Sequence, residues 1–167
     1  MTTTKAGGRA LQVTTPSDRE IRITRSFDAP RQLVWEAYTR PELLKRWLGA
    51  MPGWSWAVCE MDVREGGRYR WVWRGPEGAE LGLGGEYKEV VPFERLVSTE
   101  KYDQAWYPGE AVGTVEFTER GGRTTLVTTL RYDSKATRDA VLQSPALGGM
   151  EMGYTLLDTL LASIATA

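Results

Sequence analysis

Histidine is absent from this chain of 167 residues. Its absence excludes the Ser-His-Asp and Cys-His arrangements of hydrolases and every metal site that needs an imidazole ligand. Cysteine occurs once, as Cys59, so no disulfide can form within the chain and no paired-cysteine metal site is possible. Acid or base chemistry would therefore depend on carboxylates, lysine, tyrosine or this one thiol.

A surplus of charge of either sign is also lacking. The 21 basic and 22 acidic residues give a formal net charge of -1. A protein that binds nucleic acid without regard to sequence depends on positive charge, so this balance disfavours nucleic acid as a partner. No apolar run is long enough to indicate a secretory signal or a membrane span. We predict a cytoplasmic protein with no nucleic-acid partner and no membrane span.

Phosphate-loop and dinucleotide-binding motifs are missing as well. We predict no cofactor and no metal, and without a recognisable catalytic constellation the sequence favours a protein that is not an enzyme. Four carboxylates fall on expected strands, and we interpret them as solvated charges on the outer face of a sheet: Glu60, Glu86, Glu100 and Glu116. One that faced a cavity would have a raised pKa and could act as a general acid or base. Cys59 is expected to be a buried core thiol.

The chain divides into a short tail and one domain. Residues 1–17 are polar, rich in Gly and Thr and without periodicity, which predicts a mobile tail. We predict a single domain over residues 18–167. Its first segment, "REIRITRSF", alternates isoleucine with charged residues, as a half-buried strand does. The next, "FDAPRQLVWEAYTRPELLKRWLG", has helical spacing and two prolines placed as in the first turns of two short helices.

The rest of the chain predicts strands followed by a helix. Turn signals such as "REGGR", "RGPEG" and "ERGGR" divide residues 54–131 into six short strands. Short connections indicate an antiparallel meander with one apolar face. In the closing "MEMGYTLLDTLLASI" the apolar residues recur at helical intervals, so a long helix can cover that face. The pattern predicts an α+β fold with a curved antiparallel sheet on a long C-terminal helix.

One predicted strand, "RYRWVWR", places Tyr69, Trp71 and Trp73 on one face with arginines between them. Such rings can fill a core, line an apolar ligand cavity or stack on nucleic-acid bases. Base stacking is disfavoured because the arginines point away from the rings and the net charge is slightly negative. The pattern leaves core and cavity as alternatives.

Four segments carry a resemblance to a known family: "ITRSFDAPRQLVWEAYTRPELLKRWLG", "DVREGGRYRWVWRGPEG", "GGEYKEVVPFERLV" and "GMEMGYTLLDTLLASI". In order and spacing they resemble bacterial homologues of the activator of the ninety-kilodalton heat-shock-protein ATPase, within the START-like superfamily that includes the birch-pollen allergen. The resemblance covers nearly all of residues 19–164. It implies a helix-grip fold, in which a curved antiparallel sheet wraps around a long C-terminal helix and two short helices follow the first strand.

The resemblance also implies a range of functions. Members of the superfamily bind lipids, sterols and polyketides between sheet and helix, some cyclise polyketides, and the eukaryotic namesake stimulates a chaperone ATPase. We therefore expect a small hydrophobic molecule as the ligand of a monomer or homodimer. The alternative is a protein-interaction module whose partner is a protein such as a chaperone, and a less favoured alternative is a polyketide cyclase-like enzyme.

The expected cavity wall combines residues marked by the resemblance with neighbours on the same predicted faces. By position, the resemblance marks Trp47, Trp71, Trp73 and Tyr154 as cavity-facing. The full set of candidates that we expect to line the cavity is Trp47, Cys59, Met61, Tyr69, Trp71, Trp73, Tyr154 and Leu157. The chain departs from the usual pattern of the family at Leu48 and Tyr154, where tryptophan is common, and both changes alter the shape of the expected pocket.

Overall fold

The computed structural model describes residues 11–165. The elements follow in the order β1 (Gln12–Thr14), β2 (Glu20–Phe27), α1 (Arg31–Thr39), α2 (Pro41–Leu44), β3 (Ser55–Met61), β4 (Arg68–Arg74), the short 3-10 helix η1 (Pro76–Gly78), β5 (Glu80–Val91), β6 (Arg95–Tyr102), β7 (Ala111–Arg120), β8 (Arg123–Arg131), α3 (Lys135–Leu142) and α4 (Ala146–Ala165).

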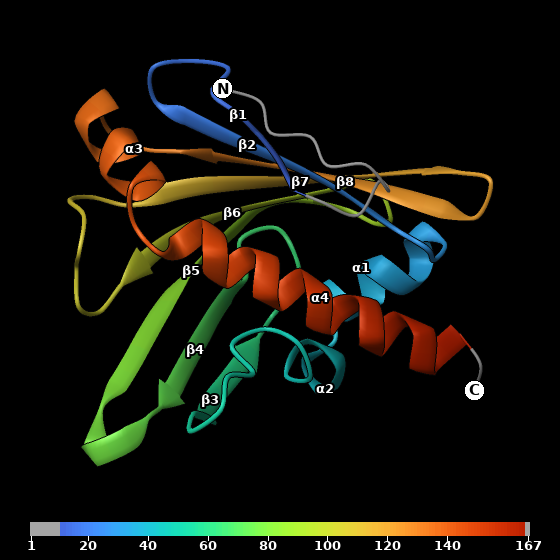
Figure 1. Cartoon of the computed structure of the whole chain (residues 1–167), viewed down its shortest axis with the longest axis horizontal. Helices are drawn as coiled ribbons and strands as arrows, with labels where there is room; N and C mark the ends of the chain where they lie inside the picture. The colour runs from blue at the N-terminus through green and yellow to red at the C-terminus, as the bar shows by residue number, and fades with distance from the viewer. Residues whose placement is uncertain (1–10, 166–167) are drawn as a thin grey trace.

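The strands form one curved sheet of eight strands in the order β1-β2-β8-β7-β6-β5-β4-β3. Every neighbouring pair is antiparallel. The sheet bends around α4, which runs across its concave face, and the two short helices follow β2 (Figure 1). This is the predicted α+β helix-grip fold, and the six strands expected between residues 54 and 131 are β3 to β8.

The structure differs from the prediction in two places, before β2 and after β8. Residues 12–14 were expected in the tail, yet they form β1 and pair with Thr24, Ile23 and Arg22 of β2. The sequence did not reveal β1 because three residues are too few to show the alternation of a strand. The remainder of that tail, residues 1–10, lies outside the described residues. The short helix α3 was not predicted, although Ser134 caps it by accepting a hydrogen bond from the backbone N–H of Thr137.

The second half of α4 packs tightly on the sheet. Leu157 is fully buried, and Leu160 and Leu161 are 3% and 2% exposed. They lie in the same core as Ile23 and Phe27 of β2, which are also fully buried. Burial of large aliphatic and aromatic side chains on both surfaces makes this region the main source of apolar stabilisation.

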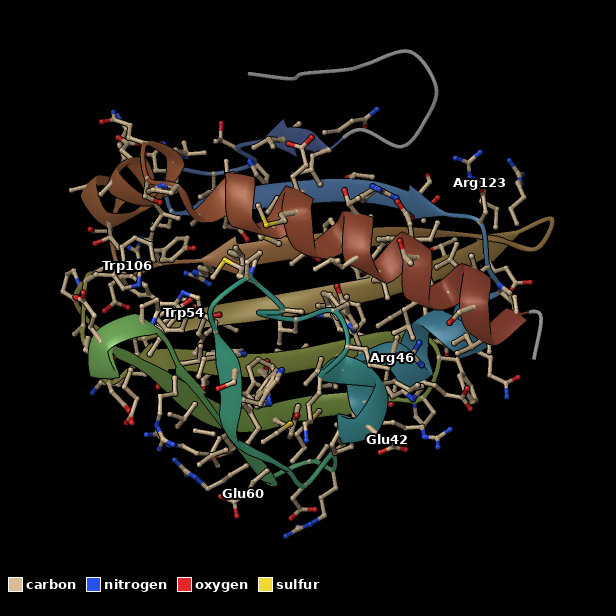
Figure 2. The ribbon with its side chains drawn as sticks, turned by 60° about the horizontal axis from the view of Figure 1, so that its bottom comes forward. Glu42, Arg46, Trp54, Glu60, Trp106 and Arg123 are labelled. Carbon is tan, nitrogen blue, oxygen red and sulfur yellow. The ribbon has the colours of Figure 1, made fainter. Side chains whose placement is uncertain are left out.

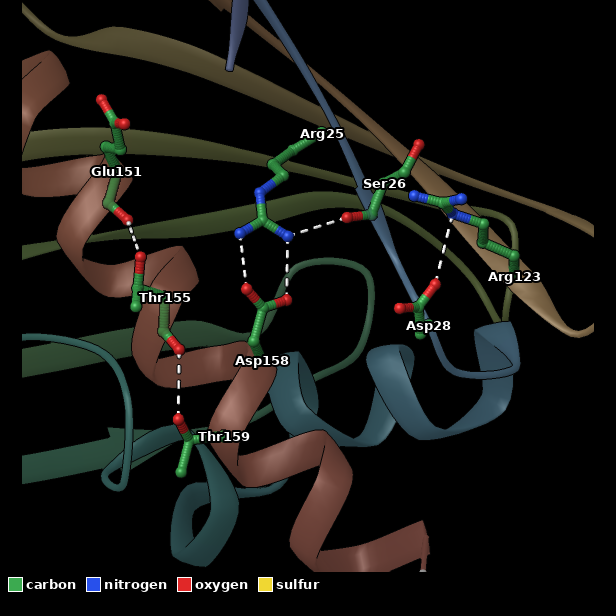
Figure 3. A network of polar contacts seen from close by, with 8 residues as sticks. All are labelled: Arg25, Ser26, Asp28, Arg123, Glu151, Thr155, Asp158 and Thr159. Carbon is green, nitrogen blue, oxygen red and sulfur yellow. Dashed lines mark hydrogen bonds and ion pairs between the residues drawn. The ribbon is translucent and has the colours of Figure 1, made fainter. Parts of the chain in front are cut away.

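A buried ion pair fastens the same half of α4 to β2. The guanidinium of Arg25 donates two hydrogen bonds to the carboxylate of Asp158, at 2.8 and 2.6 Å (Figure 3). The Arg25 side chain is 6% exposed and its guanidinium carbon lies 4.7 Å from the centre of the Phe27 ring. Two parallel hydrogen bonds satisfy both charges and fix the position of α4 along β2.

Candidate functional site

A cavity of about 400 Å³ lies between the concave face of the sheet and the first half of α4. The helix residues that line it fall between Ala146 and Leu156, and none comes from the described turns after Leu156. The opposite wall comes from β4, β5, β6, β7 and β8, and the loop after α2 closes one side. The cavity therefore lies beside the tightly packed core and shares α4 with it.

Five of the eight candidate residues line this cavity: Trp47, Tyr69, Trp71, Trp73 and Tyr154. The other three lie outside its lining. Leu157 is one residue past the last helical position that reaches the cavity and is fully buried in the core. Cys59 and Met61 belong to the edge strand β3, where they pair with Trp71 and Tyr69 of β4. They are partly buried against the core, and burial raises the pKa of the Cys59 thiol.

Strand β4 forms an aromatic wall. The Tyr69 and Trp71 rings are 4.4 Å apart and the Trp71 and Trp73 rings 6.4 Å apart, measured between centroids. On the neighbouring strand β5, Leu83 pairs with Trp71 and Leu81 with Trp73, and both leucines also line the cavity. The alternation of the strand therefore presents one continuous apolar surface to the space under α4.

Two indole N–H groups in this wall have no hydrogen-bond partner. Nε1 of Trp71 and Nε1 of Trp73 are buried, and no acceptor lies within reach in the described part of the chain. By contrast, Nε1 of Trp47 donates to the backbone oxygen of Ala37 at 2.9 Å. Buried donors are normally paired, because an unpaired one loses its hydrogen bonds to water without replacement. Two donors in the side chains of one cavity wall are therefore left unsatisfied by the described residues.

Gly49, in the loop after α2, lies directly against Trp73. Its φ is +67°, and a Cβ placed there would lie 2.3 Å from Nε1 of Trp73. Only glycine combines this backbone conformation with so close an approach. The loop therefore packs against the Trp73 ring, which also contacts Trp56 of β3 with 4.6 Å between ring centroids.

Glu100 also lines the cavity, so the expectation that it is a solvated charge on the outer face is wrong. It lies on β6 in alternation with Leu96, Ser98 and Tyr102, all of which face the cavity. Of the described residues that line the cavity, Glu100 is the only one with an acidic or basic side chain. Burial raises the pKa of its carboxyl, and hydrogen bonds from Tyr107 and Tyr102 act in the opposite direction.

Tyrosines surround the Glu100 carboxyl. The Tyr107 hydroxyl donates to Oε1 of Glu100 at 3.2 Å, and the Tyr102 hydroxyl also forms a hydrogen bond with this carboxyl. The Tyr107 ring makes edge contacts with Tyr102 and Tyr132, at 6.0 and 5.4 Å between centroids. Burial, followed by the charge of Glu100, raises the pKa of all three phenols. They therefore stay neutral at physiological pH.

Tyr154 marks the boundary between the cavity and the core. Its hydroxyl lies 3.4 Å from Oγ1 of Thr128 and forms a hydrogen bond with the hydroxyl of Tyr38. Its ring makes an edge contact with Phe27 at 5.4 Å and lies 6.4 Å from Trp47. Tyr38, Trp47 and Thr128 line the cavity with it, whereas Phe27 belongs to the packed core. Burial is the largest cause of the raised pKa of Tyr154.

The cavity opens at the end where α4 begins. Met51, Trp106 and Met152 line it and are 39%, 45% and 52% exposed. Trp54 lines it as well, and Trp54 and Trp106 lie toward the same end of the molecule (Figure 2). These side chains come from the loop after α2, the loop between β6 and β7, and α4. They form an apolar rim around the opening of the cavity.

The arginines of β4 and the other three carboxylates lie away from the cavity. Nη1 of Arg70 donates to Asp103 at 2.7 Å, and Arg68 and Arg74 pair with Glu86 and Glu80 at 3.9 Å. Glu116 pairs with Arg95 at 3.4 Å, and Glu60 is exposed. These groups are the solvated outer-face charges that the sequence predicted.

Across residues 11–165 no helix has the length and apolar character needed to cross a membrane. Within the same residues, no group of three or more acidic or cysteine side chains is placed to hold a metal ion. The chemistry on offer in the cavity is therefore apolar contact, hydrogen bonding by indoles and phenols, and one carboxyl.

Comparisons with known proteins identify relatives of the whole domain. The sequence model described as "Activator of Hsp90 ATPase homolog 1-like protein" matches residues 28–162. A crystal structure of a protein from Rhodobacter sphaeroides is similar with 36% identity and a TM-score of 0.84, covering 91% of this chain and 98% of that one. A crystal structure from Nitrosomonas europaea is similar with 26% identity and a TM-score of 0.79, covering 92% of this chain and all of the other. A comparison with curated protein sequences found no significant match.

Proposed function

The chain belongs to the family of Activator of Hsp90 ATPase homolog 1-like proteins, and from this premise we propose that it binds a small, mainly apolar molecule in the cavity under α4. The observation that carries the proposal is an aromatic cavity whose buried indole donors are unpaired. An apolar ligand with a carbonyl or ether oxygen can fill the space and, with a small adjustment of the ring, accept from Nε1 of Trp71.

The size of the cavity supports occupancy by a ligand. Small-molecule sites range from about 300 to about 1,000 Å³, and this cavity has a volume of about 400 Å³. An apolar void of this size, if sealed and empty, would cost about 10 kcal/mol, which is comparable to the whole stability of a domain. An open rim and an exchangeable ligand avoid that cost. A ligand that buries about 300 Å² of apolar area gains about 7 kcal/mol before the costs of association, which limits the expected affinity to micromolar or weaker unless polar contacts add to it.

Two alternatives have less support from the site. A protein-interaction role would use the outer face of the sheet, but the arginines of β4 are engaged there in ion pairs within the chain. A cyclase-like reaction would need an acid and a base, and Glu100 is the one such group among the described cavity residues. Binding needs neither a free basic surface nor a second catalytic group.

The test is titration with N-phenylnaphthylamine, an uncharged apolar probe that accepts excitation energy from tryptophan. Wild-type protein should bind it saturably with micromolar affinity. The matched variants are Gly113→Leu and Val112→Leu, neighbours on β7. Gly113 lines the cavity, and a Cβ there would meet Leu130 at an ordinary 3.5 Å, whereas Val112 is not part of the lining.

Gly113→Leu should abolish saturable binding because its side chain occupies the cavity, and Val112→Leu should bind as the wild type does. Equal binding by both variants, or no saturable binding by wild-type protein, would contradict the proposal.

A further inference from the structure

The polar end of the cavity has the composition of a site for an organic cation. It combines one carboxyl, Glu100, with the rings of Tyr102 and Tyr132, while Tyr107, which is not part of the lining, donates a hydrogen bond to the carboxyl. We propose that the cavity selects apolar molecules that carry one protonated amine, and that Glu100, Tyr102 and Tyr132 receive the ammonium group. This inference rests on the proposed function, because it names the class of molecule that the same cavity binds.

The charges around the cavity favour a cation and disfavour an anion. Glu100 is the only acidic or basic side chain among the described residues of the lining. No arginine or lysine within residues 11–165 forms an ion pair with it. A bound carboxylate or phosphate would therefore meet a like charge and no compensating one, whereas an ammonium supplies the missing countercharge.

The tyrosine rings add a second attraction for a cation. Tyr107 contacts Tyr102, Tyr132 and Trp106 edge to face, with the Trp106 ring 4.9 Å away. The faces of aromatic rings are negative, so the rings of this cluster that line the cavity, Tyr102, Tyr132 and Trp106, can attract an ammonium or alkylammonium group. Trp106 also belongs to the exposed rim, which places aromatic surface along the path to Glu100.

The hydrogen bonds at Glu100 leave acceptor positions free. A carboxylate has about four lone-pair positions. The hydroxyls of Tyr107 and Tyr102 take part of them and hold the carboxyl in one orientation. An ammonium donates up to three hydrogen bonds, so it can use the remaining positions without displacing either tyrosine.

Binding of an amine should be coupled to the ionisation of Glu100. The groups that face it are Tyr69 from β4, Tyr102 on β6, Tyr107 from the β6–β7 loop and Tyr132 after β8. Burial raises the pKa of all of these phenols, so they add no charge. Burial also raises the pKa of Glu100, so its carboxyl takes up a proton more readily than an exposed one. Affinity for an amine should therefore increase with pH above the ordinary carboxyl range.

The experiment is displacement of N-phenylnaphthylamine by three ligands of equal chain length: decylamine, decanol and decanoate. Wild-type protein should bind decylamine at least about tenfold more tightly than decanol, since a hydrogen bond to a charged group contributes at least that factor. Decanoate should be the weakest of the three. The affinity for decylamine should rise between about pH 5 and about pH 8, where the amine itself stays protonated.

The diagnostic variant is Glu100→Gln, which keeps the shape and removes the charge, and its control is Glu60→Gln on the outer face. Glu100→Gln should lose the preference for decylamine over decanol and its pH dependence, while Glu60→Gln should retain both. If decanol or decanoate binds as tightly as decylamine, or if the preference survives in Glu100→Gln, amine selection is wrong although the cavity binds ligands. If wild-type protein binds neither the probe nor any of the three, the proposed function fails and this inference fails with it.

Discussion

Helix α4 covers two unlike regions of the same sheet. Its second half carries Leu157, Leu160 and Leu161, and these are between 0 and 3% exposed against β2. Its first half lines the cavity with both small and large residues, among them Gly149, Met150 and Tyr154. The sheet opposite the first half supplies large rings, yet the space of about 400 Å³ stays unfilled. The same helix therefore packs tightly on the sheet in one half and bounds a cavity in the other.

The hydrogen bonding of polar groups also differs between the two regions. We call the second half of α4 with β2 the packed region, and the first half of α4 with the cavity the hollow region. In the packed region, Arg25 and Asp158 satisfy each other through two hydrogen bonds (Figure 3). In the hollow region, the indole nitrogens of Trp71 and Trp73 are unpaired and Glu100 has phenols but no cation around it. Satisfied groups stabilise the fold, whereas unsatisfied ones beside a cavity are available to a ligand.

The largest expected effect is on the free energy of unfolding, which should fall more for a truncation in the packed region than for one in the hollow region. Leu157→Ala should lower the free energy of unfolding by about 4 kcal/mol, because it opens a void in a fully buried site. Its neighbour Leu156 already lines the cavity and is partly exposed, so Leu156→Ala should cost only about 1 kcal/mol. Urea denaturation measures both. Equal losses would mean that the two regions are packed alike.

The next effect tests the loop that closes the hollow region. Gly49→Ala should cost about 3 kcal/mol and weaken probe binding, because its Cβ would clash with Trp73 at a φ of +67°. Gly78 has a φ of +78° with no atom near its Cβ position, so Gly78→Ala isolates the backbone cost of about 1 kcal/mol. Denaturation and probe titration together check the pair. Identical losses would show that contact with Trp73 contributes nothing.

A smaller effect is expected from breaking the Arg25–Asp158 ion pair of the packed region. Asp158→Asn should cost about 2 kcal/mol, since it leaves the buried Arg25 guanidinium without a countercharge while water reaches the Asp158 side, which is 21% exposed. Probe affinity should stay unchanged. The exposed Arg40–Glu42 pair serves as control, and Glu42→Gln should leave the denaturation midpoint where it is. A loss of probe binding in Asp158→Asn would show that the two regions are coupled.

The smallest effect concerns pH. Burial in the folded state raises the pKa of Glu100 above its ordinary value, so the folded protein holds this proton more tightly than the unfolded chain. The associated stability is fully present below the unfolded pKa and is lost as pH rises through the folded pKa. Glu100→Gln should therefore be more stable than wild type at neutral pH and equal to it in acid. Denaturation at several pH values checks this, and a constant difference would contradict it.

Much of the fold could be predicted from local patterns. Alternation in "REIRITRSF" and "RYRWVWR" identified β2 and β4, and the helical spacing after Met150 identified α4. These elements are long enough for their period to be unambiguous. β1 has only three residues and α3 only eight, and each is held by tertiary contacts more than by its own sequence.

The site was less predictable because a cavity is a property of two surfaces together. The sequence placed Tyr69, Trp71 and Trp73 on one face, but it contained no measure of how far α4 stands from them. Glu100 carried a usable signal, since it shares its alternation with Leu96 and Tyr102. A single acidic residue in a strand is more often solvated, and this one is enclosed because its face of β6 lies under the first half of α4.

The most direct measurement is a proton–nitrogen correlation spectrum of the indole N–H groups of the seven tryptophans, recorded while N-phenylnaphthylamine is added. Trp71 and Trp73 line the cavity with unpaired N–H groups, whereas Trp35 is packed against Phe117 at 5.2 Å between ring centroids and lies outside the lining. If the hollow region binds a ligand, the Trp71 and Trp73 signals shift saturably and the Trp35 signal stays in place. Unchanged Trp71 and Trp73 signals, or equal shifts at all seven, would contradict the account.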